Sequence, residues 1–585
     1  MKKNLQNITK SCSKDKKDIL LNIFAKTRLC FDFQNIILLL LFIFVGFIIL
    51  YPILMIFINS LQAEGDFNIS GYINVFKSSS NIKSLINSFK LSFGVLLGTW
   101  FIGGMLAFLR NRTDFRFKNL IDFFIFLSFV VPPYVIAIAW IELTSRGGYI
   151  NRILLKMFPN INYTFQTYSL KAAILILIIH LYPLVYFGVS NALIKINRDL
   201  ENSAKISGAT NFKVLFTIVI PLLFPAFIST GLLVISRSMA NFEVVAQLAL
   251  PVGESVLTTQ IFSAISQLRL NLASILSLVL VGISYLFFLV SENKLSKKRY
   301  YFEDYNSNIN ENYIKLGKFD FIINFIVVVF FIITFIIPMC TIFISSLLKR
   351  WGIPVSLKNI TIDNYKILFL ENEMMRNSIL NSIFYGLVSA TIAIIIGSLA
   401  VYLYKNNRDI KFKFLFNICQ LPIAFPNIIL AIGAIFAWIN EPIKLYGTKW
   451  IIIITYIVLF IPIVIKQIKG ISDNISDSMD KSAMIMGIPL INRYKDIFIP
   501  HIKDGLISGW LICFMIALKE VSISLLLYAK GTETIGVMLF TVQSNSYGLE
   551  MTSCISVVVI VISIIGNFIV RKIGVRSFND GRINY

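Results

Sequence analysis

The chain has 585 residues, of which 56% are hydrophobic and 15% are charged; its 54 Lys and Arg against 31 Asp and Glu give a formal net charge of +23. Soluble globular proteins carry about 25% charged residues, so this composition excludes a protein of that class, and also a disordered chain, a collagen-like fibre or a secreted disulfide scaffold. It predicts a polytopic membrane protein whose positive charges lie in cytoplasmic loops. Nucleic-acid binding is the alternative, and the location of the charges decides between the two.

The first 35 residues form a basic leader, which precedes an apolar run at 36–58. That run is too long for the core of a signal peptide, and no A-x-A cleavage site accompanies it. A bilayer span needs about 20 apolar residues. We therefore predict a basic cytoplasmic segment at 1–35 and an uncleaved membrane helix after it.

Eleven further apolar runs are long enough to cross a bilayer. A polar stretch at 292–318 divides all twelve into six and six, which predicts an all-α polytopic membrane protein with two tandem six-helix halves, 36–291 and 319–571, and a cytoplasmic tail at 572–585. The eleven runs lie near 85–109, 119–143, 171–193, 214–236, 268–291, 320–347, 378–404, 414–438, 449–468, 502–528 and 549–571.

Basic loops set the predicted orientation. Loops 110–118 and 405–413 each carry four basic residues and one acidic residue, and the leader and the 292–318 linker are basic as well. The positive-inside rule places all of these, together with both termini, in the cytoplasm. Much of the charge is thereby explained without nucleic acid, which is not an expected partner. The exception is the outer segment 146–156, which predicts a short amphipathic helix at the outer interface.

The two halves repeat each other in sequence. Segment 201–221 aligns with 480–500, which places Gly208 on Gly487, and a proline follows each glycine at the same distance. We call the shift from Gly208 to Gly487 the repeat offset. Earlier positions repeat at a slightly larger shift: Asn87-Ser88 with Asn381-Ser382, Gly103 with Gly397, and Pro133 with Pro426. Both halves have the same predicted topology. The repeat is therefore parallel, which predicts a pathway at the interface between the halves.

The repeated segments between the fourth and fifth spans of each half are polar and have small residues before the glycine. Small residues allow close approach to another protein, and Gly permits a turn with positive φ. Pro221 and Pro500 suit the beginning of the next span. An ordinary helix–turn–helix connection is the alternative, but two copies with the same spacing on the same side favour a docking function.

These segments resemble the EAA loops of permease subunits of binding-protein-dependent ABC importers. On that pattern Glu201 or Asn202 takes the acidic position of the first copy, and Asp480 and Lys481 flank it in the second. Both copies depart from the pattern, because Asn202 and Lys481 align with the usual Glu and Ser replaces the first Ala. The residues that the resemblance assigns to ATPase coupling are Glu201, Asn202, Ser203, Ala204, Gly208, Ala209, Pro221, Asp480, Lys481, Ser482, Ala483, Gly487, Ile488 and Pro500.

The fused arrangement is similar to ferric iron importer permeases over about 85–290 and 378–571, with supporting stretches at 145–155 and 519–540. The resemblance implies the MetI-like type I ABC permease fold, a bacterial cytoplasmic membrane, two copies of a separate ATPase and an extracytoplasmic solute-binding protein. It implies ferric iron as the substrate. Related permeases serve thiamine, phosphonate, polyamines and molybdate, which stay as alternatives.

Catalytic and metal-binding motifs are missing from the sequence. The nearest Gly-Lys, Gly317-Lys318, lacks the rest of a P-loop, and neither HExxH nor G-x-S-x-G occurs. The six cysteines form no CxxC pair and only two histidines are present. We expect no enzyme activity, metal site or bound cofactor in this chain, with ATP hydrolysis in the partner ATPase. A membrane enzyme or sensor is disfavoured because no soluble stretch exceeds about 35 residues. An ion-coupled secondary transporter is a weaker alternative, because it would favour inverted repeats.

Ionisable and polar residues near broken spans are the candidates for the translocation pathway, because charge is costly in lipid. The segments 238–262 and 517–540 are predicted to flank the axis between the halves. Lys519 and Glu520 could instead pair locally in a structural role, Glu142 is expected to be solvated at the outer end of its span, and His180 to be a hydrogen-bonded interior imidazole. The candidate pathway residues are Asn241, Glu243, Lys519 and Glu520.

Overall fold

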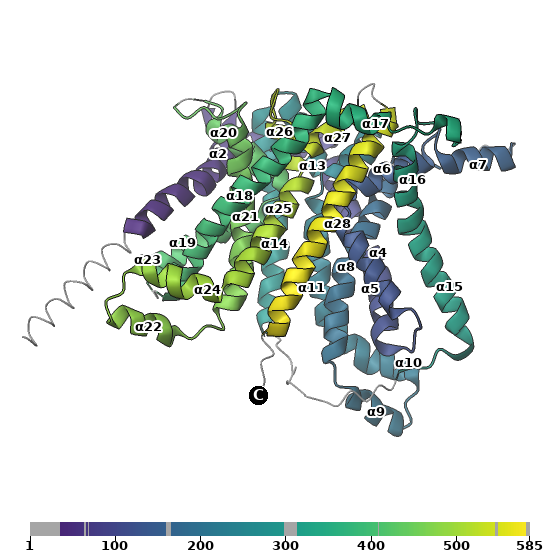
Figure 1. Cartoon of the computed structure of the whole chain (residues 1–585), viewed down its shortest axis with the longest axis horizontal. Coiled ribbons are helices and arrows are strands. Elements are labelled where there is room, and N and C mark those ends of the chain that lie inside the picture. The colour runs from purple at the N-terminus through teal and green to yellow at the C-terminus, as the bar shows by residue number, and fades with distance from the viewer. Residues whose placement is uncertain are drawn as a thin grey trace, which may run out of the picture.

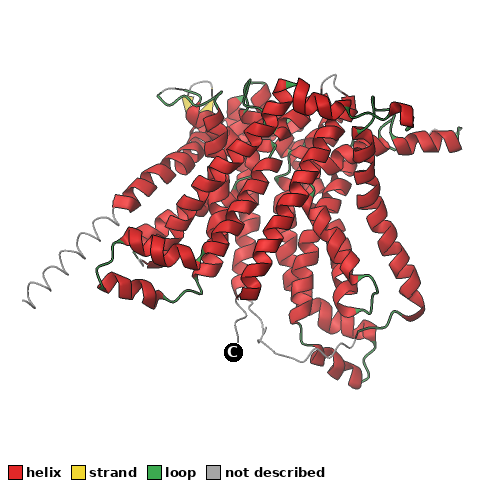
Figure 2. Ribbon diagram, in the orientation of Figure 1, coloured by secondary structure: helices red, strands yellow, loops and turns green. Residues whose placement is uncertain are grey.

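The computed structural model describes most of the chain as a bundle of helices (Figure 1, Figure 2). The predicted leader at 1–35, the middle of the predicted linker at 298–312 and the last five residues lie outside the described residues. The described ranges are 36–63, 66–67, 70–159, 165–297, 313–406, 409–440, 442–544 and 548–580.

Nine helices among the described residues are long and apolar enough to cross a membrane, or up to twelve if each of three bent pairs counts as one span. Two-residue strands β1 (Gln62–Ala63) and β2 (Asp66–Phe67) pair in an antiparallel manner and are the only named strands in this part of the chain. The long helices are Ile36–Leu61 (ending in α2, Tyr51–Leu61), α4 (Ser79–Arg112), α8 (Leu170–Lys195), Asn211–Met239 (α10, Asn211–Val214, and α11, Ile220–Met239), α14 (Leu270–Lys297), Gly317–Ser346 (α15, Asp320–Phe331, and α16, Ile337–Ser346), α18 (Glu373–Asn406), α21 (Lys449–Ser472) and α28 (Gly548–Asp580).

Shorter helices connect these spans or line the ends of the bundle. They are α3 (Ser70–Lys77), α7 (Tyr149–Met157), α9 (Arg198–Ile206), α12 (Glu243–Leu248), α13 (Leu257–Ser266), α17 (Asp363–Lys366), α22 (Asp477–Ile485), α23 (Leu490–Asn492), α26 (Ser522–Leu527) and α27 (Ile535–Ser544). The predicted amphipathic helix at 146–156 corresponds to α7, which projects sideways from the end of the bundle opposite α9 and α22 (Figure 1).

Three of the predicted spans correspond to sharply bent pairs of helices. The run 119–143 divides into α5 (Lys118–Val130) and α6 (Pro133–Thr144) at 98°, and 414–438 into α19 (Ile410–Gln420) and α20 (Asn427–Trp438) at 114°. Prolines stand at both breaks, where they remove N–H donors and disfavour helical geometry in the preceding residue. The run 502–528 ends at Lys519: α24 (Ile499–His501) meets α25 (Lys503–Lys519) at 79°, and α26 is separate.

Four prolines inside spans follow a wide π-helical turn. The π turns end two residues before Pro52, Pro221, Pro338 and Pro500, at η1 (Gly46–Leu50), η2 (Leu215–Val219), η5 (Ile332–Ile336) and η9 (Arg493–Phe498). A proline lacks an N–H and its ring crowds the carbonyl four residues earlier, so a wider turn accommodates it. Pro221 and Pro500 are the second residues of α11 and α24, and a π turn directly precedes each of these helices.

The repeat is visible in helix packing. A Cβ added to Gly103 would lie 2.9 Å from Val185 Cβ, and one added to Gly397 would lie 2.6 Å from Val464 Cγ1. Val185 and Val464 are equivalent under the repeat offset. Equivalent glycines therefore let α4 approach α8 in the first half and α18 approach α21 in the second.

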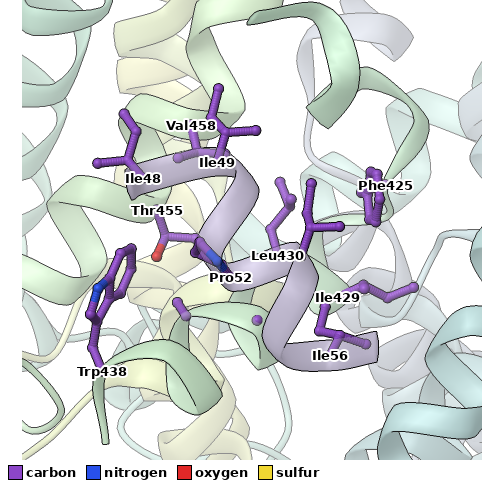
Figure 3. A pocket seen from close by; sticks show the side chains of 13 residues that line it. Ile48, Ile49, Pro52, Ile56, Phe425, Ile429, Leu430, Trp438, Thr455 and Val458 are labelled. Atoms are coloured by element: carbon purple, nitrogen blue, oxygen red, sulfur yellow. The ribbon is translucent and has the colours of Figure 1, made fainter. Parts of the chain in front are cut away.

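The first span of each half packs against the other half. Helix α2 packs on α20, while α16 packs on α6. A small apolar pocket of about 10 Å³ lies where α2 meets α20 and α21 (Figure 3). That volume is no larger than one water molecule needs, and the hydroxyl of Thr455 in its wall donates to the Ile451 carbonyl at 2.7 Å. The pocket is therefore a packing gap.

Two helices extend beyond their predicted limits. Helix α14 continues to Lys297, into the predicted linker, and α28 continues to Asp580, into the predicted tail. The far end of the linker docks on the loop after α4, where the Ile314 amide donates to the Arg112 carbonyl at 2.9 Å. This contact places the start of the second half beside the basic loop 110–118.

Candidate functional site

The two repeat loops, which we define as 197–214 and 476–493, have the same backbone geometry. Gly208 and Gly487 adopt the left-handed conformation with φ of +87° and +74°, as their spacing predicts. The Ala209 amide donates to the Ala204 carbonyl at 3.0 Å, and the Ile488 amide to the Ala483 carbonyl at 3.1 Å. These bonds end α9 and α22 in the same glycine-dependent motif, which satisfies otherwise unpaired helix carbonyls.

The other end of each loop helix is also capped. Asn197 Oδ1 accepts from the Asp199 amide at 2.8 Å, and Ser476 Oγ accepts from the Ser478 amide at 3.3 Å. Asn and Ser are favoured N-cap residues because they satisfy free amides of the first turn. The two capping residues are equivalent under the repeat offset, so both helix ends are repeated.

Apolar side chains stand exposed at matching positions of the two loops. Ile206 is 88% exposed and its equivalent Ile485 is 75% exposed; Phe212 is 77% exposed and its equivalent Ile491 is 49% exposed. Scattered exposed apolar residues need no explanation, but apolar residues exposed at equivalent positions of two folded loops are candidates for a contact with a partner. Sequence reasoning had not singled out these four residues, although the repeat offset could have found them.

One acidic residue of each loop, Glu201 or Asp480, points into the protein. Arg112 Nε lies 3.0 Å from Glu201 Oε1, and Arg493 Nη1 lies 2.7 Å from Asp480 Oδ2. Tyr402 also donates to Asp480 Oδ1 at 2.9 Å. Glu201 and Asp480 are equivalent under the repeat offset, so each half pairs the same loop position with a buried arginine.

In each half a basic side chain caps the helix that leads into the repeat loop. It comes from the end of the second span, α4 in the first half and α18 in the second. Arg112 Nη2 donates to the Leu193 carbonyl at 3.0 Å, and Lys405 Nζ donates to the Ile475 carbonyl at 2.7 Å and to the carbonyl of Ser472. Leu193 and Ser472 are equivalent positions. Cations at helix C-termini satisfy free carbonyls and complement the helix dipole, so each loop is anchored to the bundle by charge.

The repeated Asn-Ser pairs hold the broken segments at the opposite end of the bundle. Asn87 Nδ2 donates to the Ser255 carbonyl at 3.0 Å, and Asn381 Nδ2 donates to the Glu533 carbonyl at 3.0 Å. Ser88 and Ser382 each accept a backbone amide at 2.8 Å, from Leu257 and Ile535. Side chains thus replace the helical hydrogen bonds that these irregular segments lack.

Glu243 and Ser522 meet at the interface between the halves. Ser522 Oγ donates to Glu243 Oε1 at 3.4 Å, and the two residues begin α12 and α26. The two positions are also equivalent under the repeat offset. Two equivalent residues can touch only close to the axis that relates the halves, so the broken segments meet on that axis.

The other candidate pathway residues have structural bonds. Glu520 is 4% exposed and accepts from the Ile523 amide at 2.8 Å and the Ser524 amide at 3.1 Å, which caps α26. Asn241 Oδ1 accepts from the Val244 amide at 3.1 Å at the start of α12.

A local Lys519–Glu520 pair is not what the structure shows. Lys519 Nζ donates at 2.5 Å to the Val130 carbonyl in the other half. Helix α5 ends at Val130, so this carbonyl has no intrahelical partner. Lys519 is the last residue of α25 and reaches this carbonyl across the interface.

Glu142 contradicts the expectation of a solvated carboxylate. It is 0% exposed and accepts a hydrogen bond from Ser553 of α28, with Ser345 of α16 beside it. The sequence places Glu142 near a span end, but α16 and α28 of the other half cover it. His180, expected inside the protein, lies against the Ser128 carbonyl.

Among the described residues, no cluster of three His, Cys, Asp or Glu side chains could hold a metal ion. Cys340, Cys419, Cys513 and Cys554 are free thiols. Cys12 and Cys30 lie outside the described residues.

This chain is similar to permease proteins of several transport systems. The ferric transport system permease protein of Actinobacillus pleuropneumoniae is 24% identical over 559 residues, which cover 93% of this chain and 79% of that protein. A putative ferric transport system permease protein of Haemophilus influenzae is 24% identical over 512 residues, covering 85% and 78%. The molybdenum transport system permease protein of Escherichia coli K12 is 30% identical over 164 residues, covering 28% and 66%.

A family match covers both halves. Residues 101–293 and 393–576 each match the family described as binding-protein-dependent transport system inner membrane component. The two matches together span more than half of the chain, and each includes one repeat loop and one of the segments that meet on the axis. The chain therefore belongs to this family of inner membrane transport components, as a fused protein that carries the family domain twice.

Proposed function

We propose that this ABC permease imports ferric iron. The observation that supports this substrate is coverage: the two ferric permeases align with 93% and 85% of the chain, both halves included, whereas the molybdenum permease aligns with 28%. Molybdate is the second candidate, because that shorter alignment has the higher identity. Thiamine, phosphonate and polyamines are the remaining alternatives.

The repeat loops are proposed to dock on two copies of an ABC ATPase in the cytoplasm. The matched exposed side chains Ile206 and Ile485, each next to a left-handed glycine turn, support this role. The acids Glu201 and Asp480 are engaged inside the protein. Docking would therefore depend on apolar and small side chains, and the acids would transmit motion of the loop to the spans behind it.

The remaining parts of the proposal follow from placing the repeat loops in the cytoplasm. The loop end of the bundle, both termini and the 292–318 linker would face the cytoplasm, and a solute-binding protein would dock at the opposite end. ATP hydrolysis would occur in the partner subunits. Rocking of one half against the other, around the contact between Glu243 and Ser522, would open the pathway to each side in turn.

Substrate choice is tested by uptake in cells that express the whole import system. We expect accumulation of radioactive iron from a ferric chelate that depends on this chain, and no competition by excess molybdate. Uptake of molybdate without uptake of iron would assign the second candidate. Uptake of neither would leave the ferric proposal without support and direct the test to the other solutes.

ATPase docking is tested with Ile206→Asp and Ile485→Asp. A charge in an apolar contact opposes association, so each variant should pull down less ATPase and the double variant least. Leu357→Asp is the matched control, because Leu357 is an apolar residue that is 91% exposed and lies outside both loops. Full ATPase recovery by the double variant would contradict the proposed docking surface.

A further inference from the structure

Arg237 is a charged residue within a membrane span and has no counter-charge. It lies in the last turn of α11, within the candidate span Asn211–Met239. Across the described ranges its guanidinium makes no hydrogen bond and no ion pair. A guanidinium remains ionised in proteins. An ionised group at this depth requires a partner or water.

The surroundings of Arg237 leave its side chain accessible to solvent. The residue lies deep among protein atoms, yet its side chain is exposed. Two other basic residues, His180 of α8 and Lys519 of α25, are half-buried. Lys519 and Arg237 both lie close enough to His180 to repel its positive charge. Since Lys519 belongs to the second half, these three basic groups lie at the interface between the halves.

Two of these basic groups already have structural contacts. Lys519 donates to the Val130 carbonyl, and His180 lies against the Ser128 carbonyl. Both carbonyls are at the end of α5, where Pro132 and Pro133 offer no N–H. Glu243, the nearest acid along the chain, is engaged by Ser522 and the Val521 backbone. Of the three basic groups Arg237, His180 and Lys519, Arg237 is the one whose donors are all free.

We infer that Arg237 binds an anionic group of the solute as it passes between the halves. A guanidinium offers five donors and suits carboxylate, phosphate and similar oxyanions. This inference rests on the proposed transport function and narrows its substrate class. Iron would cross as a complex whose net charge is negative, coordinated by carboxylate or phosphate oxygens, and a bare cation would be repelled. Molybdate, as an oxyanion, shares the same chemistry.

The effect of the Arg237 charge on its surroundings can be measured without knowing the solute. Leu233 lies one turn before Arg237 and is 50% exposed, and residues four apart on a helix are about 5–6 Å apart. In the full-length chain, Leu233→Cys is treated with a sulfonate-bearing and with a quaternary-ammonium-bearing methanethiosulfonate, and the reactivity of the parent chain is subtracted. One nearby charge should change the ratio of the two rates about tenfold.

The expected result is that the anionic reagent reacts faster and that Arg237→Gln removes this preference. Arg237→Lys, which keeps the charge, should preserve it and controls for folding. Ile516 is half-buried and is the equivalent of Arg237 under the repeat offset, so Ile516→Arg in the Arg237→Gln background should restore part of the preference. An unchanged ratio in Arg237→Gln, or no reaction of Leu233→Cys with either reagent, would overturn the inference.

Uptake separates this inference from the proposed function. If the parent chain imports iron, Arg237→Gln should reduce uptake at least tenfold and Arg237→Lys less. If it imports no iron but the reagent ratio depends on Arg237, ferric transport fails and the anion site stands. If it imports iron and Arg237→Gln imports it equally well, the anion site fails and ferric transport stands.

Discussion

The two halves anchor their repeat loops with the same geometry and different residues. In the first half Arg112 both caps the end of α8 and binds Glu201. In the second half these tasks are divided, because Lys405 caps α21 and Arg493 binds Asp480 from within the loop itself. The comparison shows that each junction has a cation on a helix end and a buried arginine on an acid, whereas one residue or two can supply them.

The helices after the loops differ more. Asn211–Met239 qualifies as a single span, whereas its counterpart bends by 79° at Ile502. Both contain a π turn and a proline at equivalent positions, so the proline does not explain the bend. The residues around the bend do differ: Leu222 is replaced by His501, whose Nδ1 lies 2.6 Å from the Ile497 carbonyl. A side chain that competes for a helix carbonyl favours a kink there.

The largest expected effect concerns the contact between Glu243 and Ser522, which hold equivalent positions in the two halves. Glu243→Cys with Ser522→Cys should form a disulfide under oxidation, because the two side chains already touch across the axis. The cross-link should abolish transport if the halves separate there, and reduction should restore it. Transport is measured with and without reductant, and either single variant serves as the control. Full transport by the cross-linked chain would contradict rocking at this point.

The next effect tests the division of tasks. Arg112→Met should lower the free energy of unfolding by about 3–5 kcal/mol, since it leaves Glu201 buried without a partner and removes a helix cap. Lys405→Met should lower it by about 1 kcal/mol, since only the cap is lost. Unfolding of the purified chain in a denaturing detergent measures both. Equal losses for the two variants would show that Arg112 does not perform two tasks.

A smaller effect should be equal in both halves. Gly208→Val and Gly487→Val force a β-branched residue into the left-handed region, which costs about 1–2 kcal/mol per residue. No atom lies within 4 Å of a Cβ at Gly208, so backbone conformation and not collision sets this cost there. The ATPase pull-down and uptake should fall in both variants, with the double variant at least as impaired. Normal values in the double variant would remove the loops from the mechanism.

The smallest effect concerns the N-caps. Asn197→Ala and Ser476→Ala should each reduce stability by about 1 kcal/mol, with the smaller loss at Ser476, whose bond is longer by distance, 3.3 Å against 2.8 Å. Hydrogen exchange of the α9 and α22 amides measures each helix separately. A larger loss at Ser476 would reverse this ranking.

Hydropathy and the repeat predicted the spans and the turns well. Gly208 and Gly487 were identified from spacing alone, because a left-handed turn has few residues that tolerate it. The bends at Pro132 and Pro426 were missed because a hydropathy run records how apolar a segment is and not its direction. The prolines were visible in the sequence, but prolines such as Pro52 occur inside spans without a comparable bend.

Long-range partners could not be predicted in the same way. Ser553 reaches Glu142 across 411 residues and Lys519 reaches Val130 across 389, so their pairing depends on how the halves pack. Arg112 was seen only as part of a basic loop. A sequence assigns it to one side of the membrane by charge, but only the folded chain shows that it is buried against Glu201.

The packing of the first span of each half on the other half limits which halves can pair. Helix α2 approaches α20 at Gly433, where an added Cβ would lie 3.1 Å from the Pro52 carbonyl. The equivalent position in α6, at the shift that pairs Pro133 with Pro426, is Trp140. Two copies of the first half would therefore bring an indole against α2 where the native partner has a hydrogen atom. The two halves are thus complementary at this contact and not interchangeable, and pairing of two first halves is sterically disfavoured there.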